Sequence, residues 1–306
     1  MWFKPIYIEG SNLGDTWYQL LWNLNKFGRK YLITKGSYEG SYRLAFDDAS
    51  GVIQYPHIRP LSPIMPEGSN LPAPTTDEDI EQYFAEYLMN GNIKENEDYK
   101  YSTWIVGGKY RIPGIEVKAQ DHLTGDDYWT ELQWIKVSNQ LDWIINHFKK
   151  FGFGNEHCFL QIGYPESNFA YDIPYNNEQE RKTSPCLRGL DFRIIEDTQE
   201  YFKCENCGYE SNTYVNTFNY FPCIKCKGNS YREIKKINYL TTKVIYRSWD
   251  LYSGWPVNMG GFTLLNEYVA SELGIEPGPL TFTCKSLHCY DFQLDVLKSW
   301  TGVNNG

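Results

Sequence analysis

Three features are missing from this 306-residue sequence, and each absence excludes a class of protein. No run of about 18 apolar residues occurs, so we expect no membrane-spanning helix. The first residues, Met1 to Pro5, lack a basic region leading into a long apolar core, so we expect no secretory signal. A net positive charge is also missing. The formal net charge is −9, which argues against a broad surface for the phosphate backbone of nucleic acid. A small pocket for a single phosphate remains compatible with that charge.

The composition predicts a sizeable core. Hydrophobic residues make up 42% of the chain and aromatic residues 17%, which suits one large domain or one domain with an insert. The eight cysteines do not indicate disulfides, because four of them stand in a metal-binding pattern. We therefore expect a reducing compartment and a cytoplasmic protein.

The metal-binding pattern consists of two C-x2-C pairs. Cys204 and Cys207 are followed, after fifteen residues, by Cys223 and Cys226. This is the spacing of a zinc ribbon, in which each pair holds one side of a tetrahedral ion. Four thiolates close the coordination shell, so the zinc is expected to be structural rather than catalytic.

The ribbon is expected at the tip of a long hairpin between two strands of the core sheet. Gly208 and Gly228 should ease the tight turns after the two cysteine pairs. A ribbon can also bind nucleic acid or protein, and its basic residues allow this, although such charges are usually just solvated. These residues are Lys203, Lys225, Lys227, Arg232, Lys235 and Lys236.

Apolar residues at helical spacing predict four helices. The second of them should begin with Thr75 as N-cap and Glu78 reaching back to it. The fourth should begin directly after Asn258, at a junction between strand and helix. The predicted ranges are 15–25, 75–90, 139–150 and 259–273.

Three sequence blocks carry the chemistry. The first is Pro185-Cys186 at the head of an apparent strand. The second runs Arg247-Ser248-Trp249-Asp250 through Gly254 and Pro256 to Asn258, and the third is His288-Cys289-Tyr290. In this order they resemble the thymidylate synthase superfamily, which includes the pyrimidine nucleotide hydroxymethylases. The resemblance is good over the C-terminal half, loose over the N-terminal half, and closest to the short archaeal type.

The resemblance implies an α+β fold with a large mixed β-sheet and flanking helices. Residues 1–306 then form one thymidylate synthase-like catalytic domain, interrupted by a zinc-ribbon insert over 200–236. It also implies a homodimer in which two sheets pack face to face.

By the same resemblance, Cys186 is the nucleophile. A thiolate that adds to C6 of a pyrimidine turns the base into an enolate, whose C5 then attacks an electrophilic one-carbon unit. This chemistry needs a cation that lowers the pKa of the cysteine and donors for the charge at O4. Arg188 and Arg247 are the candidate cations.

The other blocks bind the nucleotide. The resemblance assigns the phosphate to Arg247 and Ser248, and the sugar 3′-hydroxyl to His288 and Tyr290. Asn258 offers a donor and an acceptor, which suits O4 and N3–H of uracil. An isolated asparagine there would be a helix N-cap.

Further roles rest on the resemblance alone. Asp250 corresponds to an aspartate that contacts the base or the folate. Glu86, with Glu81 in reserve, corresponds to a glutamate that organises water and protons around the pyrimidine, although a solvated helix face is equally compatible. Tyr101 corresponds to a tyrosine near the reacting carbon, or packs in the core.

The sequence also departs from the family pattern. Two adjacent arginines that reach the partner's phosphate site are replaced by about Glu156-His157, and Leu187 stands where many members have histidine. No clean match exists for an N-terminal phosphate-binding arginine, for which Lys35 and Arg43 are the nearest cations. The chain ends soon after the third block, without the segment that closes over folate in many synthases.

The first functional hypothesis is transfer of a one-carbon unit from methylenetetrahydrofolate, or a related pterin, to C5 of a uridine nucleotide, with dUMP as substrate and dTMP as product. The first alternative is a 5-hydroxymethylase of dUMP or dCMP. The second is a catalytically reduced member that binds a nucleotide, or binds nucleic acid through the ribbon. We expect no membrane partner.

Overall fold

The computed structural model describes residues 2–34, 38–65, 73–92, 97, 99–110, 116–120, 124–131, 135–165, 184–211 and 221–301. Lys35 lies outside these residues. Within them, no helix is long and apolar enough to cross a membrane.

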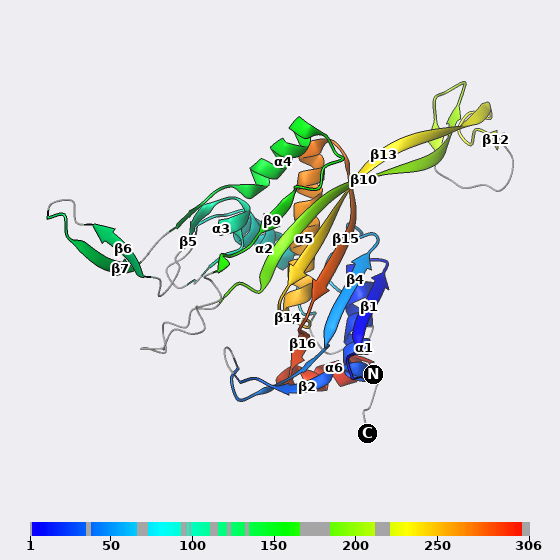
Figure 1. The fold of residues 1–306 in the computed structure, drawn as a ribbon. Coiled ribbons are helices and arrows are strands. Elements are labelled where there is room, and N and C mark those ends of the chain that lie inside the picture. The colour runs from blue at the N-terminus through cyan, green and yellow to red at the C-terminus, as the bar shows by residue number, and fades with distance from the viewer. Residues whose placement is uncertain are drawn as a thin grey trace.

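The centre of the fold is an eight-stranded mixed sheet (Figure 1). Its main path has the order β1-β4-β15-β13-β10-β11, with β9 paired to β10 and β12 paired to β13. The β1/β4 and β13/β15 pairs are parallel and the others are antiparallel. The strands are β1 (Pro5–Gly10), β4 (Asp48–Ile53), β9 (Phe159–Gln161), β10 (Leu187–Cys204), β11 (Glu210–Ser211), β12 (Phe221–Pro222), β13 (Asn229–Tyr246) and β15 (Glu276–Cys284).

Three smaller sheets accompany it. A four-stranded sheet has the order β14-β16-β3-β2, and two hairpins pair β5 with β8 and β6 with β7. Their strands are β2 (Arg29–Leu32), β3 (Tyr42–Ala45), β5 (Gly108–Tyr110), β6 (Glu116–Gln120), β7 (Asp127–Glu131), β8 (Ile135–Val137), β14 (Trp249–Asp250) and β16 (Leu287–Tyr290).

The helices are α1 (Leu13–Phe27), α2 (Asp77–Tyr83), the π-helical η1 (Phe84–Leu88), α3 (Ser102–Ile105), α4 (Gln140–Phe151), α5 (Gly254–Leu273), the 3-10 turn η4 (Asp291–Gln293) and α6 (Leu294–Thr301). The four predicted helices are therefore present. The capping prediction for the second was wrong by one residue, because Thr76 is the N-cap and Asp79 completes the capping box. Adjacent threonines followed by three acidic residues allow either register.

Helix α5 is the core of the structure. Its burial extends around most of its surface, and it contacts β13, β15 and helices α1, α2 and α4. It begins at Gly254 rather than after Asn258, so Asn258 lies within its second turn. Pro256 is accommodated in the first turn, where its missing N–H would have no helical partner. The expected strand-to-helix junction at Asn258 was wrong for this reason.

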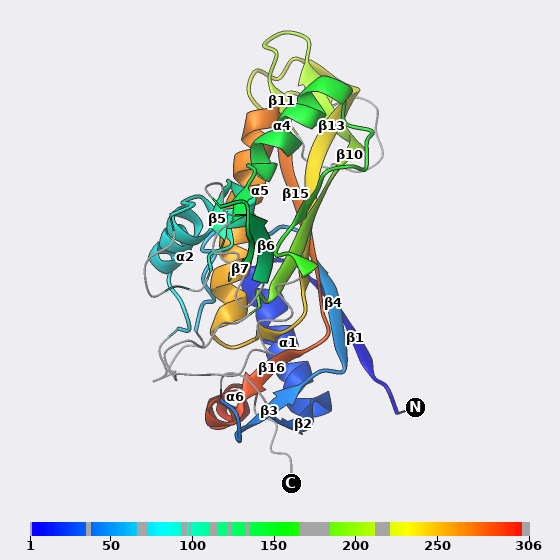
Figure 2. The same ribbon diagram turned by 60° about the vertical axis from the view of Figure 1, so that its left-hand side comes forward.

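Figure 2 shows α1 and α5 on one face of the large sheet, and no described helix on the other. Side chains on the open face include Tyr7, Phe159 and Ile195, all well exposed. Since large apolar side chains on a sheet are normally covered, this face is a candidate for contact with another protein surface.

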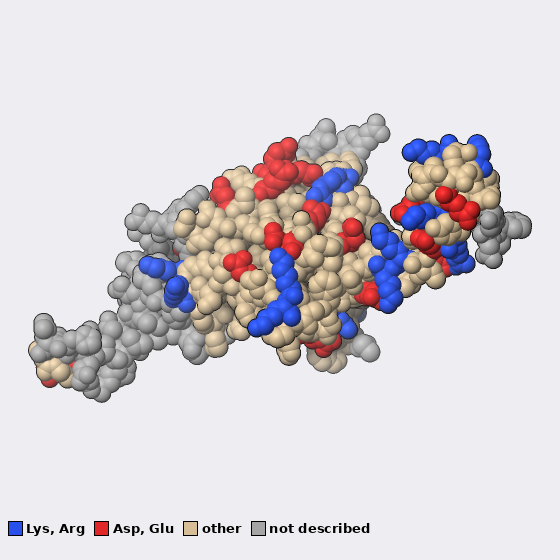
Figure 3. All heavy atoms as spheres, turned by 90° about the horizontal axis from the view of Figure 1, so that it is seen from above, with Lys and Arg blue, Asp and Glu red and all other residues tan. Residues whose placement is uncertain are grey.

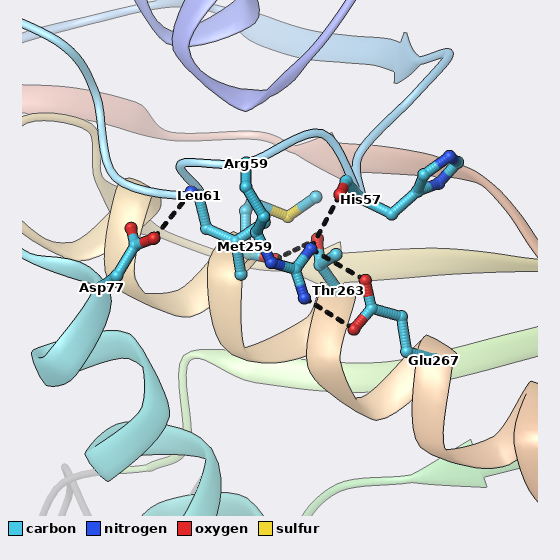
Figure 4. Close-up of polar contacts among 7 residues, drawn as sticks. All are labelled: His57, Arg59, Leu61, Asp77, Met259, Thr263 and Glu267. Carbon is cyan, nitrogen blue, oxygen red and sulfur yellow. Dashed lines mark hydrogen bonds and ion pairs between the residues drawn. The ribbon is translucent and has the colours of Figure 1, made fainter.

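A loop over residues 57–62 ties α2 to α5 (Figure 4). Arg59 forms a bidentate ion pair with Glu267 of α5 at 2.8 and 2.9 Å, and also donates to the His57 carbonyl. Asp77 of α2 accepts from the backbone N–H of Leu61 and Ser62. These contacts fix the position of α2 beside the first half of α5.

Candidate functional site

Cys186 lies where the two longest strands begin and end. It precedes β10, and its carbonyl accepts a hydrogen bond from the backbone N–H of Arg247, which follows β13. The Arg247 guanidinium donates to the carbonyls of Ser184 at 2.7 Å and Pro185 at 3.2 Å. Arg247 therefore holds the backbone that presents the thiol.

The surroundings of the Cys186 thiol have opposing effects on its pKa. Burial raises the pKa of Cys186, while the guanidinium groups of Arg247 and Arg188 lower it. Arg188 also donates to Ser184 Oγ at 3.3 Å. Burial prevails, so the free protein holds a neutral thiol beside two cations that favour the thiolate.

Tyrosine hydroxyls surround this thiol. Tyr101 Oη accepts from the Leu187 N–H at 3.4 Å, and Cys186 contributes to the raised pKa values of Tyr99, Tyr101 and Tyr246. Burial is the main cause of all three shifts. These side chains are therefore neutral phenols that can donate a hydrogen bond.

Asn258 projects from α5 toward the same cluster. Its Oδ1 accepts from Trp249 Nε1 at 2.9 Å and from the Tyr246 hydroxyl at 3.3 Å. The indole N–H is a donor only, so it fixes which end of the amide carries the oxygen. The Trp249 ring stacks on Tyr246 with centroids 3.8 Å apart. Asn258 is thus a pre-positioned amide rather than a helix cap.

A second group of polar side chains lies on the small sheet. Asp250 pairs in register with His288, and Tyr290 pairs with Arg43. Residues directly opposite each other share a face of a sheet, as do residues two apart on one strand. The four side chains therefore lie on one face, and Cys186 contributes to raising the pKa of Tyr290 to about 12, a shift caused mainly by burial.

His288 is neutral in this setting. Burial, with a smaller effect from Arg43, lowers its pKa to about 4. Nδ1 is 2.8 Å from the Ser286 carbonyl and so carries the proton, which leaves Nε2 as an acceptor. Nε2 is buried without a partner among the described residues, as is Arg43 Nε. The site therefore offers a hydrogen-bond acceptor, His288 Nε2, and a hydrogen-bond donor, Arg43 Nε.

The Asp250 carboxylate accepts hydrogen bonds from residues close by. Its Oδ1 accepts from the backbone N–H of Tyr252 at 2.9 Å and Ser253 at 3.4 Å, and Gln293 Nε2 lies 3.4 Å from Oδ2. Burial raises its pKa, and these donors oppose the shift. Asp250 shapes the turn that leads into α5.

The two glutamates suggested by the resemblance make contacts near the surface. Glu86 accepts a hydrogen bond from Gln82 in an exposed contact, and Glu81 is exposed and acts on the pKa of Arg59. Tyr83 is the residue of α2 whose side chain lies beside Tyr246 and Asn258. The π-helical turn that starts at Phe84 changes the helical phase between Tyr83 and Glu86.

The remaining core cysteines contrast with Cys186. Cys158, Cys284 and Cys289 are buried. Burial raises the pKa of each, that of Cys158 to about 11. They are inert core thiols.

The four ribbon cysteines converge at the far end of β10 and β13. Their sulfur atoms all lie within 4.8 Å of one another, with 3.4 Å between Cys204 and Cys226 and 3.7 Å between Cys207 and Cys223. A tetrahedral zinc ion with Zn–S bonds of about 2.3 Å requires sulfur atoms about 3.8 Å apart. The donor set and spacing therefore fit a structural zinc ion.

The turns after the two cysteine pairs differ. Gly208 has a positive φ of 66°, as expected, but in the second turn the positive φ of 63° belongs to Lys227 rather than Gly228. A Cβ on Gly228 would lie 2.6 Å from Asn206 Nδ2, so this glycine is required by close packing of the two turns.

The positions expected to carry an arginine pair have other contacts. Glu156 forms an exposed ion pair with Arg193, and the His157 ring lies edge-on to His147.

Comparison with known proteins finds a family similarity over the C-terminal third of the chain. Residues 199–301 match the family model of thymidylate synthase. Over this part of the chain, the sequence is similar to that of thymidylate synthases. The match contains Arg247, Asn258 and the His288-x-Tyr290 block but begins after Cys186.

Similar curated proteins come from archaea, each named "Putative thymidylate synthase". Those of Methanosarcina mazei and Methanosarcina acetivorans are 36% identical over 87 residues, which is 28% of this chain and 38% of each relative. That of Methanococcoides burtonii is 38% identical over 60 residues, 20% of this chain and 27% of the relative. The chain thus covers less than two fifths of the length of the relatives it matches.

The structure places further residues beside the candidate site that the sequence motifs did not reveal. Tyr83, Tyr99 and Tyr246 read as ordinary core aromatics, because nothing in their spacing sets them apart. Arg43 was named in the sequence only as a nearby cation without a clean motif, since its pairing with Tyr290 joins residues far apart in the sequence.

Proposed function

We propose that the chain transfers a one-carbon unit to C5 of a uridine nucleotide, with dUMP as substrate, through a covalent bond between Cys186 and C6. The supporting observation is the arrangement around Cys186: a thiol beside two guanidinium groups, with buried phenols and the Asn258 amide close by. The similarity to thymidylate synthases supports a methyltransferase-type enzyme.

The first step is addition of the thiolate. The Cys186 proton leaves to solvent, and Arg247 and Arg188 stabilise the resulting anion. The sulfur then forms a bond to C6, and the electron pair of the C5–C6 double bond moves through C4 to O4. The base becomes an enolate whose C5 is nucleophilic.

The base is read by the Asn258 amide. Two donors already occupy Asn258 Oδ1, so its NH2 group is the part that donates to O4 of uracil. This donor faces the atom on which negative charge develops, which is where a pre-positioned hydrogen bond lowers the barrier most.

The phosphate and sugar are assigned to the strand ends nearby. Arg247 and Ser248 bind the phosphate, and Arg43 adds a cation on the face that carries His288 and Tyr290. The neutral His288 accepts a hydrogen bond from the sugar 3′-hydroxyl at Nε2, and the Tyr290 hydroxyl completes the pair.

The one-carbon donor is methylenetetrahydrofolate or a related pterin, which supplies the carbon at C5. Loss of the C5 proton and departure of the folate amine give an exocyclic methylene intermediate. If it takes hydride from the tetrahydrofolate, the product carries a methyl group, and if it takes water, a hydroxymethyl group. The bond between Cys186 and C6 then breaks and restores the C5–C6 double bond. We propose the methyl product, dTMP.

Tyr101 lies beside the nucleophile, and Asp250 keeps the turn that places Tyr252 and Ser253.

The open face of the large sheet supports a homodimer. Tyr7, Phe159 and Ile195 are exposed on it, and a second copy packed face to face would cover them. The zinc ribbon is proposed to be a structural cap on the β10–β13 hairpin.

The charges of the hairpin argue against nucleic acid as its partner. Arg232 pairs with Glu200, Lys236 with Glu196, and Lys203 with Glu210. Figure 3 shows basic and acidic side chains side by side on this projecting part of the molecule. Three of the six basic residues named for the ribbon are thus paired with carboxylates, which weakens the case for a nucleic-acid surface here.

The test is a product analysis. Purified protein is incubated with methylenetetrahydrofolate and either dUMP or dCMP, and the nucleotide products are weighed by mass spectrometry. We expect a mass gain of one methylene from dUMP, none from dCMP, and no product from Cys186→Ser. A nucleotide that is unchanged in every incubation would contradict the proposal, and a hydroxymethyl product would favour the alternative reaction.

A further inference from the structure

Tyr83 has a buried hydroxyl that lies close to Tyr246 and Asn258 without a well-formed hydrogen bond to either. Tyr83 Oη is buried and makes no hydrogen bond of ordinary geometry to the described residues. Leaving such a group unpaired costs free energy that a phenylalanine at the same place would not incur. The position therefore calls for a partner that is absent from the free protein.

The backbone brings Tyr83 to this position by a close approach of two helices. A Cβ on Gly261 of α5 would lie 2.5 Å from Tyr83 Cδ1, and a Cβ on Gly260 would lie 2.7 Å from Ile80 of α2. Only glycines at these two positions allow α2 to pack so closely against α5. The π-helical turn begins directly after Tyr83, a feature often found at functional sites.

The hydroxyl points into the cluster that contains the proposed base reader. Tyr246 and Asn258 lie near enough to affect the pKa of Tyr83, and Tyr83 in turn affects that of Tyr101, the tyrosine that borders Leu187. Burial keeps the Tyr83 phenol protonated by raising its pKa, so it retains a hydrogen to donate.

Asn258 can satisfy only part of the hydrogen-bonding edge of uracil, and Tyr83 can satisfy the rest. The uracil edge carries an acceptor, O4, and a donor, N3–H. Because Trp249 and Tyr246 already occupy Asn258 Oδ1, Asn258 has only its NH2 group to offer. A second polar group is needed on this edge, and a hydroxyl can act as donor or acceptor.

We infer that Tyr83 is a base-positioning residue whose hydroxyl hydrogen-bonds the O4 and N3 edge of the pyrimidine beside Asn258. The inference rests on the proposed function. It names a contact that the free protein lacks and the nucleotide supplies. The side chain of Glu86, three residues further on, is not required for this contact.

The variant that isolates the hydroxyl is Tyr83→Phe. The matched control is Tyr87→Phe, whose ring stacks on Tyr83 at 5.6 Å and is partly exposed. Two quantities are measured for each protein: the Tm without ligand and the Kd for dUMP by calorimetry. A purely structural hydroxyl and a ligand-binding hydroxyl predict opposite results for this pair of measurements.

We expect Tyr83→Phe to melt at or above the wild-type Tm and to bind dUMP about tenfold more weakly. Tyr87→Phe should match the wild type in both. A lower Tm for Tyr83→Phe would overturn the inference, because the hydroxyl would then be satisfied within the fold. Wild-type affinity for dUMP in Tyr83→Phe would overturn it as well.

A ligand that lacks O4 locates the contact. With the pyrimidin-2-one analogue of dUMP, the difference between wild type and Tyr83→Phe should shrink, since the two deletions remove one interaction. Fully additive losses would place the hydroxyl elsewhere and contradict the inference. If the wild type binds no dUMP at all, the proposed function fails first, and this inference with it.

Discussion

The two ends of the β10–β13 hairpin hold cysteines in opposite environments. At one end a single thiol, Cys186, is half-buried, and burial raises its pKa against the effect of two arginines. At the other end four thiols converge, and burial of Cys204 is outweighed by hydrogen bonds from Cys207, Cys226 and Asn206, which lower its pKa. The same pair of strands thus presents one isolated thiol, the proposed nucleophile, and one cluster of four thiols, the proposed zinc ligands.

The difference shows what decides the role of a cysteine. Crowded sulfur atoms cannot all ionise without a cation, and a metal resolves that repulsion. A lone thiol beside guanidinium groups has cations that stabilise its thiolate, which is the form that acts as a nucleophile.

Removing two ribbon ligands should have the largest effect. Cys207→Ser with Cys226→Ser leaves only two thiolates, so bound zinc should fall from about one ion per chain to none. Metal analysis of protein purified without chelators measures this. The single variant Cys158→Ser is the control and should keep its zinc.

The chemistry at the other end should survive the loss of zinc. The double variant should still form a nucleotide adduct at Cys186, because the ligands belong to the tip of the hairpin. Retention of zinc by the double variant would refute the metal site.

The acid stability of the protein should depend on His288. Its pKa of about 4 lies below the ordinary value of 6.5, so the folded state favours the neutral ring. This stabilisation is complete above about pH 6.5 and is lost as the pH falls toward 4. Between pH 7 and 4.5 the loss should be about 2–3 kcal/mol in the free energy of unfolding.

Urea unfolding of the wild type and His288→Asn at both pH values measures this difference. The amide can still donate to the Ser286 carbonyl but does not titrate, so the variant should lose about that much less on acidification. Equal losses in the two proteins would show that His288 is not held neutral.

Asn258→Asp should shift the base preference. A carboxyl group can accept the exocyclic amine of cytosine, which the Asn258 NH2 group repels. An unsatisfied polar group costs about 1–3 kcal/mol, so the ratio of affinities for dUMP and dCMP should change about ten- to a hundredfold. Calorimetry with both nucleotides measures the ratio, and an unchanged ratio would rule out base reading by Asn258.

The smallest effect concerns the loop that braces α2 against α5. Arg59→Ala removes the bidentate pair with Glu267, which is partly exposed, and should cost about 1 kcal/mol or less of stability. Lys149→Ala breaks a more exposed single contact with Glu272 and serves as the control, with no measurable change expected. Equal denaturation midpoints for all three proteins would mean that the brace is dispensable.

Much of the site could be predicted from the sequence because its residues stand in short motifs. Cys186, Arg247 and Asn258 lie within two blocks at the ends of adjacent elements, and the structure brings them together. The mixed sheet and its flanking helices were also predicted, and the prediction is confirmed.

Two features of the site were not predictable from the sequence, because one depends on the phase of a helix and the other on strand pairing between distant residues. The π-helical turn that begins directly after Tyr83 changes the helical phase, which an ideal helical period does not anticipate. Arg43 joins the site through a strand pairing with Tyr290 that spans most of the chain. Neither leaves a local signal.

The most direct test of the account is to trap the covalent adduct. 5-Fluoro-dUMP cannot lose its C5 substituent as a proton, so with the folate donor it should remain bonded to the enzyme. Peptide mass spectrometry should find the adduct on Cys186, and Cys186→Ser should abolish it while the zinc content stays unchanged. An adduct on any of the other seven cysteines, or wild-type turnover by Cys186→Ser, would contradict the central claim.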